Sequence, residues 1–121
     1  MTTPKKSDTL GPFEQLVLTA VVTLRERAYG VPIHAKVSEL AERAVNLGSV
    51  RVTLDRLQDK GYVSSWLADP TPERGGKSKR YFRLEPAGLA ALQEAIAMSH
   101  RMLEACTESW RIGKWKPRHA K

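Results

Sequence analysis

The sequence predicts an α+β domain in which three helices precede a two-stranded hairpin and a long C-terminal helix. Apolar residues recur every three or four positions through three successive segments before residue 61, and this spacing is the period of a buried helix face. Two segments rich in β-branched and aromatic residues, 62–69 and 79–84, then flank a basic loop with paired glycines. A short helix beside a hairpin with a cationic loop is the layout of a winged helix-turn-helix, and the long helix behind it is predicted to be a dimerisation helix.

Charge and composition narrow the classes of partner. The chain has 121 residues, of which 41% are hydrophobic, so it suits one small globular domain. Its formal net charge of +7 favours a polyanion, nucleic acid before an anionic membrane surface. No apolar run reaches the roughly 18 residues that a membrane span needs, and the first residues lack the apolar core of a secretory signal. Cys106 is the single cysteine, so we expect no internal disulfide and a cytoplasmic protein.

The first two helices are placed by prolines and glycines. Pro12 suits the first position of a helix, and Glu14 in that first turn faces the positive end of the helix dipole. Gly30 interrupts the apolar pattern and is predicted to start the second helix. The predicted inward residues of these helices are Phe13, Leu16, Val17, Ala20, Val21, Leu24, Ile33, Val37, Leu40, Ala41 and Ala44. Tyr29, between the helices, is interpreted as an aromatic residue at the edge of the core, and its hydroxyl is also a candidate phosphate donor.

The third helix is predicted from about residue 49 to residue 60, with Gly61 as its stop. Its predicted inward residues are Val50, Leu54 and Leu57. At 100° per residue, one neighbouring face carries Ser49, Val52, Thr53, Arg56 and Lys60, and the opposite flank carries Arg51, Asp55, Gln58 and Asp59. Because phosphates line both rims of the major groove, the acid-free face is predicted to enter it. Arg51 stays a candidate contact in the first turn, although its spacing from Asp55 also suits a surface ion pair.

The chemistry of these side chains suggests individual contacts with DNA. Arg56 can reach a guanine edge or a phosphate, and Val52 and Thr53 present methyl groups to thymine. Ser49 at the start of the helix suits a phosphate near the helix dipole, and Lys60 is a further candidate cation. An ordinary amphipathic helix with solvated charges is the alternative for this segment.

The loop of residues 70–80 is the stronger nucleic-acid signal. Four cations against one acid, Glu73, favour a polyanion over a solvated hairpin tip. Glycines let the backbone approach a phosphate closely. The candidate DNA contacts in the loop are Arg74, Gly75, Gly76, Lys77 and Lys79. We expect Arg56 and the glycine pair of the loop to face the same side, so that both meet one duplex.

The last helix is predicted to begin at Pro86 and to carry a heptad seam. The seam positions are Leu89, Leu92, Ile96, Ser99, Leu103, Cys106 and Trp110. A helix from Leu89 to Trp110 would be roughly 30 Å long, which is too long for the core of so small a domain. All of these except Ser99 are therefore candidate dimerisation residues. Met98, Met102 and Trp110 are secondary candidates for a flat aromatic-binding pocket between protomers, ranked below plain packing.

No arrangement of residues suggests catalysis or metal binding. His34, His100 and His119 are far apart in the sequence and are interpreted as surface residues, and Cys106 has no neighbouring base. No nucleophile elbow or phosphate-binding glycine loop is present. We therefore expect a protein that is not an enzyme and that needs no cofactor or metal.

An ordered set of short motifs resembles a known family. The motifs are Leu10-Gly11, Ala28-Tyr29-Gly30, Leu47-Gly48-Ser49-Val50, Thr53-Leu54-Asp55-Arg56-Leu57, Lys60-Gly61-Tyr62-Val63, Pro72-Glu73-Arg74-Gly75-Gly76-Lys77, Arg80-Tyr81-Phe82-Arg83-Leu84 and Pro86-Ala87-Gly88. Over about residues 10–92 the chain resembles the PadR family of bacterial transcriptional regulators, in its short form with a single C-terminal helix. The family often has a tyrosine in place of Arg51 and a threonine cap in place of Glu85; the first difference leaves the operator sequence open.

The resemblance implies a sequence-specific repressor that binds double-stranded DNA as a homodimer. Such a protein binds a palindromic operator and releases it on binding a small aromatic effector. The expected organisation is a flexible tail (1–9), a DNA-binding domain (10–85), a dimerisation helix (86–112) and a basic tail (113–121). The alternative is a winged-helix module for protein interaction or small-molecule sensing with little DNA binding. Salt-dependent binding to duplex DNA distinguishes the two.

Overall fold

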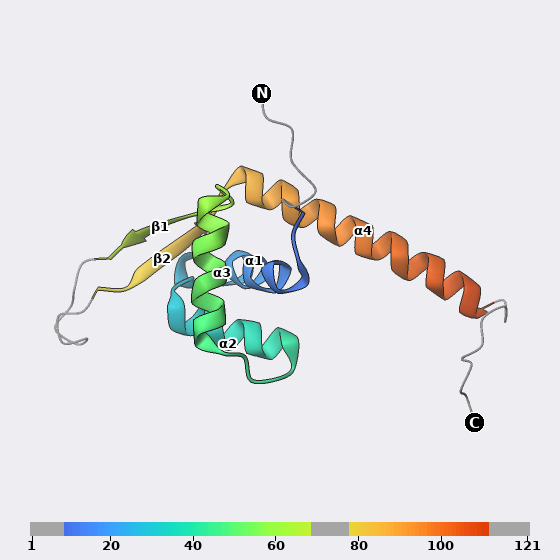
Figure 1. Cartoon of the computed structure of the whole chain (residues 1–121), viewed down its shortest axis with the longest axis horizontal. Coiled ribbons are helices and arrows are strands. Elements are labelled where there is room, and N and C mark those ends of the chain that lie inside the picture. The colour runs from blue at the N-terminus through green and yellow to red at the C-terminus, as the bar shows by residue number, and fades with distance from the viewer. Residues whose placement is uncertain (1–8, 69–77, 112–121) are drawn as a thin grey trace.

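The computed structural model describes residues 9–68 and 78–111, and Figure 1 shows their arrangement. The elements are α1 (Pro12–Leu24), a 3-10 turn (Arg25–Arg27), α2 (Gly30–Ala41), α3 (Leu47–Asp59), β1 (Val63–Leu67), β2 (Arg80–Leu84) and α4 (Pro86–Arg111). The two strands pair antiparallel, with Val63 opposite Leu84 and Leu67 opposite Arg80. The predicted α+β winged helix-turn-helix with a long C-terminal helix is confirmed.

Helix α1 lies at the centre of the domain and packs against α2, α3, β2 and α4. Pro12 begins it and Glu14 stands in its first turn, as predicted. Its buried apolar residues are Val17, Leu18, Ala20, Val21 and Leu24. Leu18, which the single predicted stripe left out, is fully buried because neighbours cover α1 on more than one side.

Helix α3 has a defined cap at each end. It begins at Leu47, two residues earlier than predicted, because the side chain of Asn46 accepts a hydrogen bond from the Ser49 amide at 3.0 Å. Gly61 ends it as predicted, with a φ of 80° that suits glycine. The Tyr62 amide donates to the carbonyl of Leu57 at 2.9 Å, which satisfies a terminal carbonyl of the helix.

Two side chains of α2 fix the turn that leads into α3. Nε2 of His34 donates to the carbonyl of Val45 at 2.5 Å, and Oγ of Ser38 accepts from the Val45 amide at 3.2 Å. His34 is half-buried by this role, so its interpretation as a free surface residue is wrong. The bond places the Nε2 proton toward the turn and fixes how the chain enters α3.

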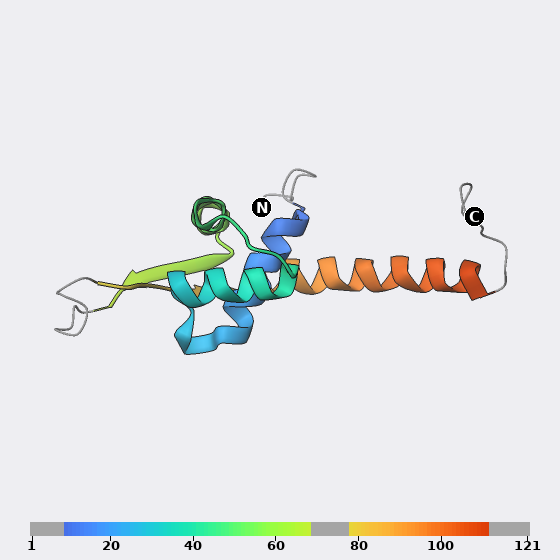
Figure 2. The same ribbon diagram turned by 90° about the horizontal axis from the view of Figure 1, so that it is seen from below.

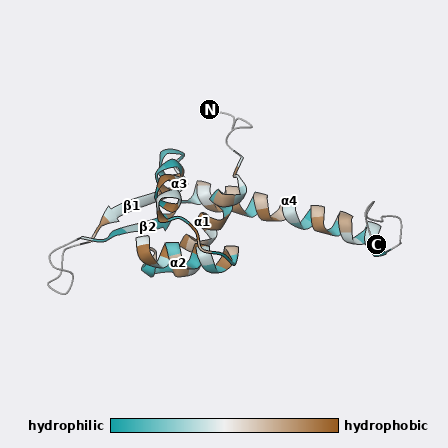
Figure 3. Ribbon diagram, turned by 60° about the horizontal axis from the view of Figure 1, so that its bottom comes forward, coloured by the Kyte–Doolittle hydropathy of each residue, from teal (hydrophilic) through white to brown (hydrophobic). Residues whose placement is uncertain are grey.

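Helix α4 packs on the domain only through its first three turns. Gly88, Leu92 and Ala95 are buried there, whereas every residue from 96 to 111 is exposed. The expected excess length of this helix is confirmed, and Figure 3 shows apolar residues recurring along it. Leu92 is a correction to the predicted dimer seam, because it is only 5% exposed within its own protomer's core.

Candidate DNA-binding surface

Helix α3 projects from one side of the domain, and Figure 2 views it end-on above the hairpin and α2. Its buried residues are Val50, Thr53, Leu54 and Leu57. The prediction that Thr53 contacts DNA is therefore wrong, since its side chain is only 4% exposed. Thr53 lies three residues after Val50 and four before Leu57, which puts it on their face of the helix. Ser49, Val52 and Arg56 are exposed, as the predicted contact face requires.

A groove of about 680 Å³ runs between α3, the start of α2 and the base of the wing. Its walls are formed by Tyr29, Gly30, Val31, Leu47, Arg51, Leu54, Asp55, Ser78, Lys79, Arg80 and Phe82. We call it the wing groove. Arg51 of α3 thus shares a surface with Lys79 and Arg80 of the hairpin, so three cations gather along one side of α3.

Arg56 lies on the other side of α3. It lines a separate depression beside the start of α1, together with Thr53, Lys60 and residues 9–14 except Leu10. The predicted partnership between Arg56 and the wing is therefore corrected in part, since Arg51 is the α3 arginine that faces the wing base. The loop residues Arg74, Gly75, Gly76 and Lys77 lie outside the described residues.

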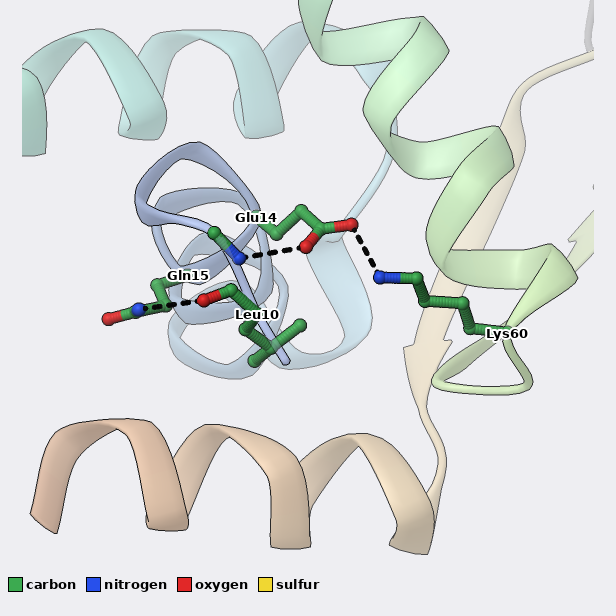
Figure 4. Close-up of polar contacts among 5 residues, drawn as sticks. Leu10, Glu14, Gln15 and Lys60 are labelled. Atoms are coloured by element: carbon green, nitrogen blue, oxygen red, sulfur yellow. Dashed lines mark hydrogen bonds and ion pairs between the residues drawn. The ribbon is translucent and has the colours of Figure 1, made fainter. Parts of the chain in front are cut away.

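Lys60 is held in an ion pair within the protein, as Figure 4 shows. Its Nζ lies 3.0 Å from Oε2 of Glu14, and the other carboxylate oxygen of Glu14 accepts from the Gly11 amide at 2.9 Å. Glu14 is buried and the Lys60 side chain is only 19% exposed. The charge of Lys60 joins the end of α3 to the start of α1, so it is already paired within the protein, and DNA binding by Lys60 stays a prediction.

Tyr29 anchors the hairpin to the helices. Its ring centroid lies 5.1 Å from that of Tyr81, whose ring stacks on Trp66 across the hairpin at 5.9 Å. Nζ of Lys79 lies 4.0 Å from the centroid of Tyr29, a cation–π contact. Of the two interpretations of Tyr29, the structure supports packing at the core edge, and the residue also lines the wing groove.

Two consecutive side-chain hydrogen bonds connect α3 to both strands of the hairpin. Oγ of Ser65 donates to Oε1 of Gln58 at 2.7 Å and accepts from a guanidinium N–H of Arg80 at 2.8 Å. These contacts hold the wing base at a fixed angle to α3. Arg80 was not among the predicted DNA contacts, although its position directly after Lys79 in a basic loop was a usable signal.

The arginines of α3 are not neutralised by described neighbours. Neither Arg51 nor Arg56 forms an ion pair with any residue in 9–68 or 78–111, and the pair expected between Arg51 and Asp55 is not formed there. Both side chains are exposed. Their charges are therefore available to a polyanion on either flank of α3.

No cluster of three or more potential metal ligands occurs among residues 9–68 and 78–111. Across those same ranges, no helix has the length and apolarity that crossing a bilayer requires.

Comparisons with known proteins agree with this geometry. The fold matches a PadR family transcriptional regulator from Eggerthella lenta DSM 2243 (23% identity, 78% of this chain and 80% of that chain, TM-score 0.63). It also matches a transcriptional regulator from Clostridium thermocellum (14% identity, 88% and 97%, TM-score 0.66) and a PadR family regulator from Clostridium difficile R20291 (19%, 83% and 98%, TM-score 0.63). No curated protein matches the sequence. A sequence model described as "Transcriptional regulator PadR-like family" matches residues 17–94. The chain therefore belongs to the PadR-like family of DNA-binding transcriptional regulators, which are not enzymes.

Proposed function

We propose that this protein is a cytoplasmic, homodimeric repressor that binds a palindromic operator in double-stranded DNA. The observation that carries the proposal is the exposed flank of α3, where Arg51 shares the wing groove with Lys79 and Arg80. A helix fits the major groove with its flanks near the two phosphate rims. Arg51 and the wing base contact the phosphates on one rim, and Arg56 on the opposite flank contacts the phosphates on the other.

Removing cations from the wing groove should weaken binding to duplex DNA. The double substitution Arg51→Ala and Lys79→Ala is expected to lower affinity on the order of tenfold at low salt. The dependence of log K on log salt should flatten by roughly 0.9 for each phosphate that the variant no longer neutralises. Fluorescence anisotropy of a labelled duplex over a salt series measures both quantities.

Arg101→Ala is the matched control for this experiment, since Arg101 is an exposed cation on α4, remote from α3. It should change neither affinity nor salt dependence appreciably. An unchanged affinity in the double variant would remove the wing groove from the interface. Wild-type protein that shows no salt-dependent binding would favour the protein-interaction alternative.

Helix α4 supplies the proposed dimer contact. Exposed apolar side chains recur along it at Leu89, Ile96, Leu103 and Trp110, with Cys106 on the same seam. Every residue from 96 to 111 is exposed to solvent. Water-exposed apolar residues at heptad spacing are stabilised by pairing with a second helix. A dimer of this kind would place two α3 helices in successive major grooves, about 34 Å apart.

Charge introduced into this seam should dissociate the dimer. The double substitution Ile96→Glu and Leu103→Glu is expected to give a monomer, because two buried carboxylates per chain would lose hydration at the interface. Light scattering after size exclusion measures the mass, and circular dichroism checks the fold. Ala97→Glu with Ala105→Glu adds the same charge to the opposite side of α4 and should leave the mass of the dimer unchanged. A monomeric wild type would contradict the proposal.

A small aromatic effector completes the proposal. Met98, Met102 and Trp110 are exposed on α4, but at 100° per residue Met98 lies on the side of Ala105, so Met102 and Trp110 are the two that offer polarisable and aromatic surface to a planar ligand beside the seam. Between two α4 helices such a ligand would change their separation and, with it, the spacing of the two α3 helices. Release of the operator would then relieve repression.

A further inference from the structure

The face of α3 that points away from the core has an unusual composition for a surface that meets DNA. At 100° per residue, Gly48, Val52, Asp55 and Asp59 lie opposite the buried residues of the helix. Val52 is 57% exposed and Asp55 is exposed. The arginines are on the two flanks, whereas the centre of the face carries one aliphatic group, Val52, and two acids, of which Asp55 is the one within a turn of Val52.

Val52 and Asp55 are each unfavourable at an interface with DNA unless the DNA places a matching chemical group opposite the side chain. The apolar side chain of valine gains free energy only when it is removed from water, and a carboxylate is repelled by the phosphates of DNA. Asp55 has no ion pair within residues 9–68 and 78–111, so a neighbouring cation in these ranges does not neutralise it. Two base edges in the major groove have the required chemistry: the 5-methyl group of thymine suits Val52, and the 4-amino group of cytosine donates to a carboxylate.

The small residues of the first turn allow α3 to approach the base edges. Gly48 and Ser49 are exposed and lie one turn before Val52, so no long side chain stands between the helix and the groove floor. Val52 and Asp55 are separated by about 4.5 Å along the helix axis at 1.5 Å per residue. This spacing is close to the roughly 3.4 Å between base pairs, so the two residues can meet neighbouring base pairs.

We propose that α3 reads pyrimidine edges, with Val52 against a thymine methyl group and Asp55 accepting a hydrogen bond from a cytosine amino group. The inference rests on the proposed function and adds the chemistry of its half-site. Arg51 and Arg56 then hold the phosphate rims on either side, and discrimination between bases comes from the centre of the face.

Base analogues test the two contacts separately on the site recovered by selection from a random duplex library. Replacing the contacted thymine with deoxyuridine removes only the methyl group and should weaken binding of the wild type roughly fourfold. Replacing the contacted cytosine with 2-pyrimidinone deoxynucleoside removes only the amino group and should weaken it about tenfold or more. Val52→Ala should be insensitive to the first change and Asp55→Ala to the second.

Asp55→Ala should also change the affinity for random duplex DNA, and in the opposite direction. Loss of the acid should tighten binding to random duplex while abolishing the preference for cytosine, because phosphate repulsion is relieved and the specific acceptor is removed. Glu104→Ala removes an exposed acid from α4 and Val22→Ala shortens an exposed valine of α1, so these controls should retain the wild-type preferences.

The outcomes separate this inference from the function on which it rests. If selection recovers no preferred duplex, the proposed function fails. If a site is recovered but lacks the thymine and cytosine pair, or tolerates both analogues, the readout by Val52 and Asp55 is wrong while operator binding stands. Weaker binding of Asp55→Ala to every duplex would show that Asp55 supports the DNA-binding surface without reading a base, and would also overturn the inference.

Discussion

Gly88→Ala is expected to lower the free energy of unfolding by roughly 3 kcal/mol, at the upper end of the range for overpacking. A Cβ atom at residue 88 would lie 2.2 Å from the carbonyl oxygen of Tyr62 and 3.0 Å from the side chain of Leu84. The carbonyl belongs to the backbone and already accepts from the Glu85 amide at 2.9 Å, so it cannot turn aside freely. The start of α4 must therefore move away from the hairpin.

Gly30→Ala is the matched control for this prediction. A Cβ atom at residue 30 would meet nothing within 4 Å, so the same chemical change should be nearly neutral there. Alanine also favours a helix interior over glycine by up to about 1 kcal/mol, and this gain partly offsets the clash at residue 88. Urea denaturation followed by circular dichroism measures both variants. Equal stability of Gly88→Ala and the wild type would contradict the close approach of α4 to Tyr62.

Lys60→Met is expected to destabilise the domain by about 2–3 kcal/mol at neutral pH, because the buried Glu14 carboxylate loses its cation. The destabilisation is smaller than for a fully enclosed pair because Lys60 keeps 19% of its side-chain exposure. Methionine preserves most of the aliphatic stem, so the change isolates the charge. Binding to DNA should also weaken, since the end of α3 loses its tie to α1.

A second substitution distinguishes the ion pair from packing. Glu14→Gln combined with Lys60→Met removes both charges and should recover much of the stability, since no unpaired buried charge remains. Arg101→Met breaks an exposed pair with Glu94 on α4 and should have little effect. If the double variant were no more stable than Lys60→Met, the destabilisation would come from packing, and the electrostatic role of Lys60 would be rejected.

Local chemistry explains what could be predicted from the sequence. Pro12, Gly61 and Pro86 each mark a helix boundary, because proline fixes its own φ and glycine accepts the positive φ of a helix end, and all three boundaries are observed where expected. The apolar period likewise predicted Val50, Leu54 and Leu57 as buried residues of α3, but it missed Thr53, whose polar side chain gives no apolar signal. The choice of fold followed from these elements in their order along the chain.

The predictions for site residues failed or were incomplete where the structure brings together residues that are far apart in the sequence. Lys60 resembles any surface lysine until Glu14, 46 residues away, is folded against it. Leu92 fits a heptad seam, but the first turns of α4 lie on the domain and enclose it. Arg51 and Arg56 could be assigned to different sides of α3 only once α1 and the wing base were placed around the helix.

The backbone of Tyr62 connects α3, the proposed DNA-reading helix, with α4, the proposed dimerisation helix. The amide of Tyr62 closes the end of α3 at Leu57, while its carbonyl receives the Glu85 amide and abuts Gly88 at the start of α4. The backbone of one residue therefore contacts the end of α3 and the start of α4. In the proposed homodimer, a change in the angle at which two α4 helices cross would be passed through these backbone contacts to α3, and would shift the spacing at which the two α3 helices meet DNA.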